Sequence, residues 1–321
     1  MVRILQAWSF LLILLVHGAV QGQAFPGKPI RIIVPVAVGG SADAMTRTMA
    51  TALADRIGQS VVIENRGGVG GNVGMEAGAR VPPDGYTLTM VFQSMASNPF
   101  LYATLPFDVV KDFAPISHMV NYQLVLAVNA AVPANNIAEL IALAKAKPGG
   151  LTYGSSGAGG ASHLAFENFM SLTGTRLVHI PYKGNAPAMT DLMGGQITAI
   201  VDALNGTLAP IRTGKVRALG VGSKHRSVIL PDVPSIAETV PGFDMVGWLG
   251  MAAPAATPPD RVAYLSREIA AVLTSPAIKQ RLTDTGNEVV ASTPAEFAQF
   301  IRAELDRYEK LIRGSGIKAN Q

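Results

Sequence analysis

The chain has 321 residues and no cysteine, which excludes a disulfide scaffold and leaves a large apolar core as the source of stability. Hydrophobic residues make up 49% of the sequence and charged residues 15%, which agrees with such a core. The formal net charge of +4 favours small anions, and the scattered Lys and Arg, without interleaved aromatic residues, argue against a nucleic-acid partner.

Residues 1–24 predict a secretory signal peptide. Arg3 provides a short positive head, an apolar run follows from Trp8 to Val16, and the small residues Gly22 and Ala24 suit a signal peptidase. The apolar run is shorter than the roughly 18 residues that span a bilayer, and Gly, Pro or a charge interrupts every later run. The sequence therefore predicts a periplasmic protein whose mature chain starts near Phe25.

Apolar strands alternate with helical segments along the rest of the chain. The run from Ile30 to Val36 is typical of a strand buried on both faces of a parallel sheet, and Met45, Met49, Leu53 and Ile57 follow at helical spacing. The same order recurs in the segments SVVIENR (60–66), GGVGGNVG (67–74), MEAGARV (75–81) and YTLTMVF (86–92). This alternation predicts an α/β fold with parallel sheets.

The second half of the chain continues the alternation. Further strands are expected in LVLAVN (124–129), LTYGS (151–155), ITAIVDA (197–203), KVRALGV (215–221) and WLGMAAP (248–254), and helices at 137–145, around Leu164 and Phe169, and at 295–313. About 297 residues after the signal exceed the usual single core and suggest two domains. The predicted division is signal peptide 1–24, lobe one 25–122 and 225–321, and lobe two 123–224.

Two loops occupy equivalent positions in these units. The segments Val38–Asp43 and Ser155–His163 each follow a strand and open a helix, with Ser41 and Ser162 as expected N-caps and Asp43 in a first turn. A helix N-terminus has free backbone N–H groups and about half a positive charge, so it favours a carboxylate or phosphate. Each loop alone is also compatible with a purely structural turn. As a pair they predict a cleft that grips an anion from both sides.

Catalytic and cofactor motifs are absent from the sequence. The segment Gly154–Ala158 departs from the G-x-S-x-G pattern of a nucleophile elbow, no dinucleotide fingerprint or Walker motif occurs, and the five His residues show no metal-ligand spacing. Only Ser155, Ser156 and His163 remain as a candidate nucleophile and base. The prediction is therefore a binding protein without cofactor or metal, not an enzyme.

Several segments together resemble one protein family. They are KPIRIIVPVAVGGSADAMTR, GQSVVIENRGGVGGNVGMEAGARVPPDGYTL, NPFLYATLPFD, ELIALAKAKPGGLTYGSSGAGGASHLAFENF, HIPYKGNAPAMTDLMGGQI, GKVRALGVGSKHR and WLGMAAPAATP. In this order they are similar to the Bug (TctC-like) family of periplasmic solute-binding proteins of tripartite tricarboxylate transporters. The resemblance covers essentially all of the mature chain.

The resemblance implies a two-lobed Venus flytrap of the periplasmic-binding-protein type, type II-like, with each lobe a mostly parallel sheet flanked by helices. It implies a cleft for a small mono-, di- or tricarboxylate, an amino acid or an aromatic acid, which is passed to membrane permease subunits. It assigns Val38–Asp43 and Ser155–His163 as the carboxylate loops. The family often has an aromatic residue at the position of Val36 and Ser or Thr at that of Gly160, which leaves ligand identity open.

Five further residues are candidates beside the loops, and of these Tyr182 and Lys183 are expected in a loop near the cleft. Lys183 can attract an anion or be a solvated surface residue, and Asp202 can accept a hydrogen bond from an amino or hydroxyl group or act as a structural cap. Gln93 and Ser94 follow a strand at the carboxyl end of the sheet. The predicted ligand-binding set is Val38, Gly39, Gly40, Ser41, Asp43, Gln93, Ser94, Ser155, Ser156, Gly157, Ala158, Gly159, Gly160, His163, Tyr182, Lys183 and Asp202.

The leading hypothesis is a monomeric receptor for a small carboxylate that works with the permease. A sensor for a two-component system has an identical cleft, and an exported carboxylate-processing enzyme is the third alternative.

Overall fold

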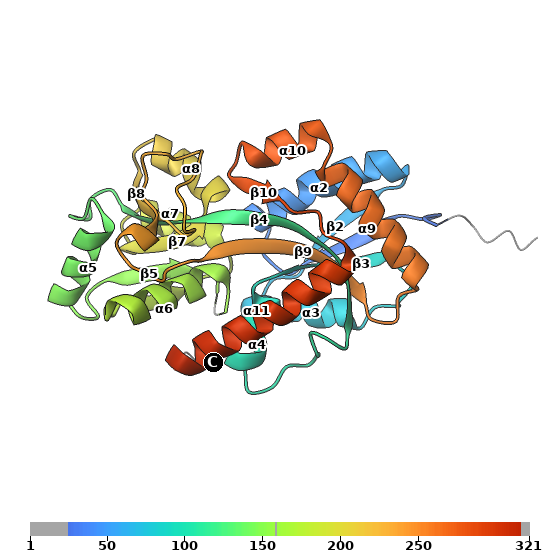
Figure 1. The fold of residues 1–321 in the computed structure, drawn as a ribbon, viewed down its shortest axis with the longest axis horizontal. Helices are drawn as coiled ribbons and strands as arrows, with labels where there is room; N and C mark the ends of the chain where they lie inside the picture. The colour runs from blue at the N-terminus through green and yellow to red at the C-terminus, as the bar shows by residue number, and fades with distance from the viewer. Residues whose placement is uncertain (1–24, 158, 316–321) are drawn as a thin grey trace, which may run out of the picture.

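The computed structural model describes residues 25–157 and 159–315 (Figure 1). The predicted signal peptide, residues 1–24, lies outside the described residues, and so do Ala158 and residues 316–321. No helix in the described ranges combines the length and the apolar character needed to cross a bilayer.

The elements follow the alternation expected from the sequence. The strands are β1 (Ile30–Val34), β2 (Val61–Asn65), β3 (Thr87–Phe92), β4 (Phe113–Asn129), β5 (Thr152–Ser155), β6 (Val178–Pro181), β7 (Ala199–Ala203), β8 (Val216–Val221), β9 (Val246–Pro254) and β10 (Asn287–Val289). The helices are α2 (Ser41–Ile57), α3 (Asn72–Ala79), α4 (Ser94–Leu101), α5 (Ile137–Ala146), α6 (Ala161–Thr173), α7 (Asn185–Met193), α8 (Leu204–Arg212), α9 (Pro259–Leu273), α10 (Pro276–Thr283) and α11 (Pro294–Ser315), with short 3₁₀ turns η1 (Val69–Gly71) and η2 (Ile236–Glu238).

The described strands form one mixed sheet in the order β2-β1-β3-β9-β4-β7-β5-β6, with β8 and β10 also paired to β4. The pairs β1–β2, β1–β3, β5–β6 and β5–β7 are parallel, whereas every pair that involves β4 or β9 is antiparallel. The inner strands β1, β3, β5 and β7 are mostly buried because helices cover both faces of the sheet, which explains their apolar runs, whereas the edge strands β2 and β6 are partly exposed. The architecture is the two-lobed α/β fold, with parallel strands in each half and antiparallel strands between the halves.

Two long strands join the halves. Residues 113–123 of β4 pair with β9, and from Leu124 onward β4 pairs with β7 and β8 (Figure 1). The expectation that this strand starts at Leu124 was wrong, since it starts at Phe113. The polar residues Ser117, His118 and Asn121 interrupt the apolar run, and pairing with β9 and β10 determines their conformation.

The lobe boundaries at residues 122 and 224 stay a prediction. The exchange of partners within β4 falls between Gln123 and Leu124. After β8, Ser235 forms a bridge with Val221, and the ring of Phe243 packs edge-on against Phe169 of α6 at 6.4 Å. These contacts favour a return to lobe one at the start of β9, later than residue 225.

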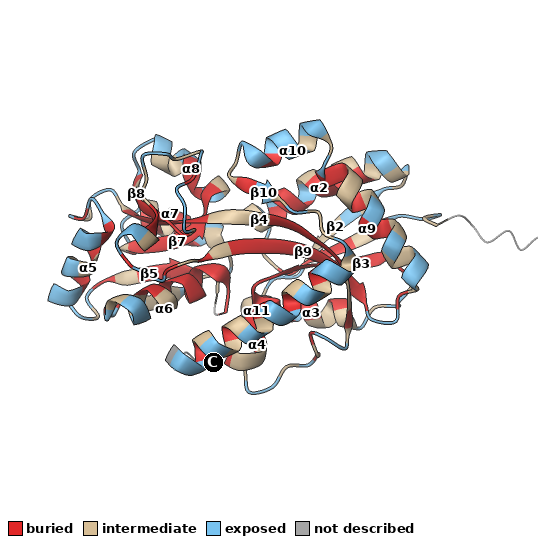
Figure 2. Cartoon of the chain, viewed as in Figure 1, coloured by how far each residue is buried: buried red, intermediate tan, exposed pale blue. Residues whose placement is uncertain are grey.

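The core lies along both faces of the sheet (Figure 2). Met45, Met49 and Leu53 of α2 are buried there, as their spacing predicts. The outer faces of the helices are exposed. The loops that follow β1, β5 and β6 are thereby held at the carboxyl ends of parallel strands, where open α/β sheets bind ligands.

Candidate functional site

The two predicted loops face one central cavity of about 70 Å³. Its lining comes from β1–α2, β3, β4, β5–α6, β6–α7, β7 and β9: Val36, Ala37, Val38, Gly40, Ser41, Ala42, Met45, Phe92, Tyr122, Leu124, Ser156, Ala161, Ser162, Gly184, Asn185, Ala186, Pro187, Asp202, Ala203 and Leu249. The described residues of this lining include no Lys, Arg or His. Fixed positive charge near a ligand would therefore come from helix N-termini.

Two grooves adjoin the central cavity. The first, called the α7 groove, has a volume of about 320 Å³ and shares Gly40, Ser41, Asn185, Ala186 and Asp202 with the cavity. The second, called the glycine groove, has a volume of about 780 Å³ and is lined by residues 67–71 together with Asn65, Tyr102, Ser156, Gly157, Gly160, Tyr182, Lys183 and others. The residues that the glycine groove shares with the cavity are Val36, Ala37, Val38, Phe92, Ser156 and Gly184.

The N-terminus of α2 forms one wall of the cavity. Gly40 is its N-cap, with φ −78° and ψ 168°, and the first helical hydrogen bond runs from Ala44 N to Gly40 O at 3.0 Å. The expectation that Ser41 is the N-cap was wrong, because Ser41 is the first helical residue. The backbone N–H groups of the first turn have no acceptor within the helix. They are a ready-made site for an anion.

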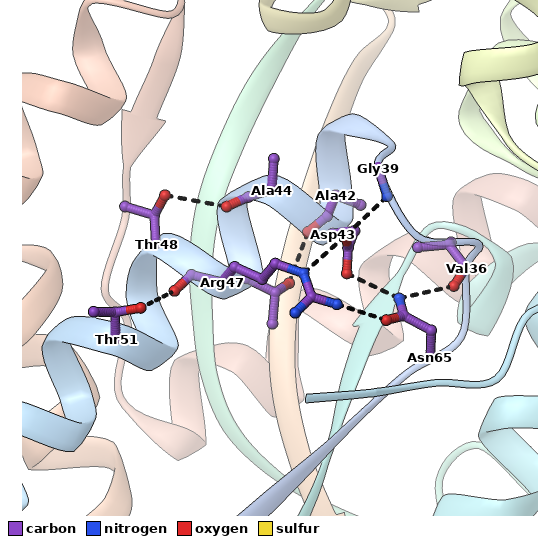
Figure 3. Close-up of polar contacts among 10 residues, drawn as sticks. Val36, Gly39, Ala42, Asp43, Ala44, Arg47, Thr48, Thr51 and Asn65 are labelled. Atoms are coloured by element: carbon purple, nitrogen blue, oxygen red, sulfur yellow. Dashed lines mark hydrogen bonds and ion pairs between the residues drawn. The ribbon is translucent and has the colours of Figure 1, made fainter. Parts of the chain in front are cut away.

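Asp43 holds this loop in place (Figure 3). Its Oδ2 accepts hydrogen bonds from Gly39 N at 2.9 Å and Arg47 Nε at 3.0 Å, and its Oδ1 accepts one from Asn65 Nδ2 at 2.8 Å. Asn65 Nδ2 also donates to the carbonyl of Val36 at 3.1 Å. Burial acts to raise the pKa of Asp43, but these donors outweigh it and the pKa is lowered. Asp43 is therefore a charged anchor of the loop.

The N-terminus of α6 forms the opposite wall. Gly160 is the N-cap, so the expectation that Ser162 fills this role was also wrong. Ser162 Oγ instead accepts a hydrogen bond from Ser156 N at 3.1 Å and lies 3.3 Å from Ser156 Oγ. Both hydroxyls line the cavity. His163 supports the turn, since its Nδ1 accepts a hydrogen bond from Gly159 N at 3.1 Å.

A partly buried polar network lies behind this loop. Ser155 Oγ is 2.6 Å from His179 Nε2, and the His179 ring stacks on that of His163 with centroids 4.2 Å apart. Glu167 accepts a hydrogen bond from Tyr153 Oη at 2.6 Å and lies 3.6 Å from His163 Nε2. Burial, together with the neighbouring His163, lowers the pKa of His179 to about 4. This network stabilises the shape of the loop without touching the cavity.

The sequence interpretation missed the contribution of α7. Gly184, with φ +119°, precedes the helix, and Asn185 at its first position lines both the cavity and the α7 groove. Asn185 donates a hydrogen bond from Nδ2 to Asp202 Oδ1 at the end of β7. Asp202 is 2% exposed, and burial raises its pKa to about 7 in spite of hydrogen bonds from Ala203 N and Asn185. The short sequence GNAP after a strand was the available signal.

The predicted residues fall into three groups. The central cavity is lined by Val38, Gly40, Ser41, Ser156 and Asp202. The grooves are lined by Gly39, Gly157, Gly160, Tyr182 and Lys183. None of the three hollows is lined by Asp43, Gln93, Ser94, Ser155, Gly159 or His163, and Ala158 lies outside the described residues.

Gln93 and Ser94 are buried behind the cavity. Gln93 Oε1 accepts a hydrogen bond from Tyr122 Oη at 3.2 Å, and its Nε2 donates to Val246 O at 3.4 Å. These bonds direct the Gln93 side chain toward the long strands. The neighbouring Phe92, the last residue of β3, lines the cavity in its place.

The described residues contain no group of three or more His, Cys, Asp or Glu side chains placed to bind a metal ion. The sequence differs from the common pattern of the resembled family at Val36 and Gly160, and both positions lie at the site. Val36 lines the central cavity and the glycine groove, and a Cβ at Gly160 would lie 2.9 Å from Ser156 Oγ. Both positions therefore bear on the shape of the space that a ligand would occupy.

Comparisons with known proteins agree on one family. A model described as "Tripartite tricarboxylate transporter family receptor" matches residues 45–317. Protein BugT of Bordetella pertussis is 36% identical over 306 residues, which cover 94% of each chain.

Three solved structures share the fold. The periplasmic binding protein BugD has a TM-score of 0.88 and 33% identity, covering 92% of this chain and 99% of its own. Rpa4515 of R. palustris with adipate has a TM-score of 0.89 and 33% identity, and it also covers 92% of this chain and 99% of its own. MatC of Rhodopseudomonas palustris with bound malate has a TM-score of 0.86 and 28% identity, covering 90% of this chain and 100% of its own.

Proposed function

Because the chain belongs to the tripartite tricarboxylate transporter receptor (TctC) family, we propose that it captures a small carboxylate between residues 38–43 and 155–163 and delivers it to membrane permease subunits. The family and its structural neighbours are solute-binding proteins, not enzymes, and the fold is that of periplasmic binding proteins. We further propose export by the predicted signal peptide and a monomeric mature protein.

The observation that carries this proposal is the meeting of two helix N-termini at one cavity without basic side chains. The first turns of α2 and α6 line it from opposite sides, with the hydroxyls of Ser41, Ser156 and Ser162. Backbone N–H groups and hydroxyls can hold a carboxylate there, and each helix terminus contributes about half a positive charge. Adipate and malate in the related structures support a small carboxylate as the ligand class.

The sequence is also compatible with two other functions. A two-component sensor requires the same cleft, and neighbouring genes for a kinase in place of a permease would favour it. An exported hydrolase requires a nucleophile that reaches its substrate. Ser155 is 0% exposed and paired with His179, so it does not support that reading.

A thermal-shift screen of the mature chain with dicarboxylates, tricarboxylates, amino acids and aromatic acids tests the proposal. A ligand that binds only the folded state adds about 2.7 kcal/mol of stability at a hundredfold excess over Kd, so the melting temperature should rise. If no acid in the screen raises it, the proposed function is wrong.

Gly40→Val tests the α2 terminus directly. Its backbone is in the ordinary extended region, and a Cβ there meets only Ala37 O, at 4.0 Å. The variant should therefore fold, while its side chain enters the cavity and lowers affinity more than tenfold. Ser275→Val, at the N-cap of α10 outside the cavity lining, is the matched control. Normal binding by folded Gly40→Val would contradict the role of this terminus.

A further inference from the structure

One carboxylate oxygen at the cavity has no hydrogen-bond donor from the protein. Asp202 Oδ1 accepts hydrogen bonds from Ala203 N at 2.6 Å and from Asn185 Nδ2. Oδ2 has no hydrogen-bond partner among residues 25–157 and 159–315. Asp202 lines both the central cavity and the α7 groove. Its Oδ2 is therefore the oxygen that can accept a hydrogen bond from a ligand in this space.

Among the described residues, no group around Asp202 donates to Oδ2. The described lining of the cavity and of the α7 groove contains no Lys, Arg or His. The nearby Tyr122 hydroxyl donates to Gln93 Oε1 at 3.2 Å. Oδ2 is not among the fully buried side-chain atoms without a partner, so it is open to the cavity and a ligand group can donate to it.

We propose that Asp202 selects ligands that carry a hydroxyl or amino group, so that the substrate class is a hydroxycarboxylate or amino carboxylate. This inference rests on the proposed function. The ligand carboxylate lies at the N-termini of α2 and α6, and its hydroxyl or ammonium group donates to Asp202 Oδ2. An unsubstituted carboxylate leaves that oxygen unpaired, and a second carboxylate placed there is repelled by the ionised form of Asp202. A site built around a substrate hydrogen bond discriminates strongly against an analogue that lacks the donor.

Matched ligand series test the proposal. Succinate, malate and aspartate form one series, and glutarate, 2-hydroxyglutarate and glutamate form another. Isothermal titration would compare the affinities of the unsubstituted, hydroxy and amino acids in each series. The same comparison would be made for any other carbon skeleton that gives the largest thermal shift. We expect the hydroxy or amino member to bind at least tenfold more tightly. Equal or tighter binding of the unsubstituted member overturns the proposal.

Asp202→Asn identifies the residue responsible. The amide keeps an acceptor for Asn185 and Ala203 but places a donor where Oδ2 was, so the preference for the substituted member should fall to about threefold or less, or invert. Asp284→Asn, at the exposed end of α10, is the control and should keep the parent's preference. An equal loss of affinity for every member of the series would assign Asp202 a structural role only and overturn the proposal.

Failure of the proposed function and failure of the inference give different results. If no carboxylate binds the parent protein, the proposed function is wrong and the inference falls with it. If carboxylates bind without regard to the substituent, only the inference is wrong. Circular dichroism of Asp202→Asn shows whether it folds, and the parent's ligand series decides the question even if it does not.

Discussion

Several side chains predicted to touch the ligand instead hold the two predicted loops in place. Asp43 binds Gly39 N, Arg47 and Asn65, and His163 accepts the hydrogen bond of Gly159 N. In both loops a polar side chain in the first turn of a helix satisfies the N–H group of a glycine that precedes it. The glycine N–H of each such pair is therefore already bonded, and the remaining N–H groups of the turn are those that can face an anion.

His179 should make stability depend on pH. Burial, with His163, lowers its pKa from 6.5 to about 4, so the folded protein keeps it neutral while the unfolded chain binds a proton. Stability is full above pH 6.5 and is lost as the pH falls toward about 4, by at most about 3 kcal/mol.

Urea unfolding at pH 7.5, 5.5 and 4.5 would measure this loss in the parent and in His179→Gln. We expect the parent to lose more stability than the variant between pH 7.5 and 4.5. Carboxyl groups with lowered pKa, such as Asp43, titrate below this window and act in both proteins. Parallel pH profiles for the two proteins would show that His179 is not the source.

At the scale of elements, the glycine run before and within α3 allows close packing. A Cβ at Gly74 would lie 2.6 Å from Pro35 Cβ and 2.8 Å from Arg66 O. Pro35 follows β1 and Arg66 follows β2, so α3 packs directly on the ends of both strands. The run also lines the glycine groove through residues 67–71. Its last glycines are thus structural, and its first ones border the site.

Gly74→Ala should destabilise the protein by about 1 to 3 kcal/mol, because backbone atoms of Pro35 must move and overpacking outweighs the better helix propensity of Ala. Gly314→Ala in α11, where a Cβ meets nothing within 4 Å, is the control and should be neutral or slightly stabilising. Urea denaturation compares the two with the parent. A neutral Gly74→Ala would mean that α3 can shift at no cost.

At the scale of the whole molecule, the two halves contact each other around the cavity. Ser97 of α4 donates a hydrogen bond from Oγ to the carbonyl of Gly159, at 2.7 Å, and a Cβ at Gly206 of α8 would lie 2.5 Å from Ser41 Oγ. Segments that follow β3 and β5 thus meet directly, as do segments that follow β1 and β7. We infer that these contacts favour the closed arrangement of the lobes, and that a bound ligand shifts the population toward it.

Ser97→Ala should weaken ligand binding about three- to tenfold, because one buried hydrogen bond of the closed form, worth about 1 kcal/mol, is lost. Ser275→Ala, which removes a hydroxyl–carbonyl bond within the α9–α10 turn, should bind as the parent does. Trp248 is the single tryptophan of residues 25–321 and adjoins Leu249 of the cavity lining, so its fluorescence can follow the titration. Unchanged affinity in Ser97→Ala would exclude this contact as a latch.

Local patterns were sufficient for much of the fold and for the two loops of the site. The helical spacing of Met45, Met49 and Leu53, the apolar run that begins at Ile30 and the glycine turns before α2 and α6 are properties of neighbouring residues. Hydrophobic periodicity reports which face of an element is buried, and a glycine before a helix reports where the chain turns. The family resemblance extended these readings to the whole mature chain.

The remaining features depend on residues that are distant in the sequence. The register of β5 on β6 places His179 opposite Tyr153, where it can reach Ser155, and the pairing of β4 with β9 extends a strand through polar residues. Asn185 and Asp202 meet because α7 begins where β7 ends, and Gln93 turns away because Tyr122 binds it. Strand register and side-chain direction are decided by packing between elements, which no local pattern encodes.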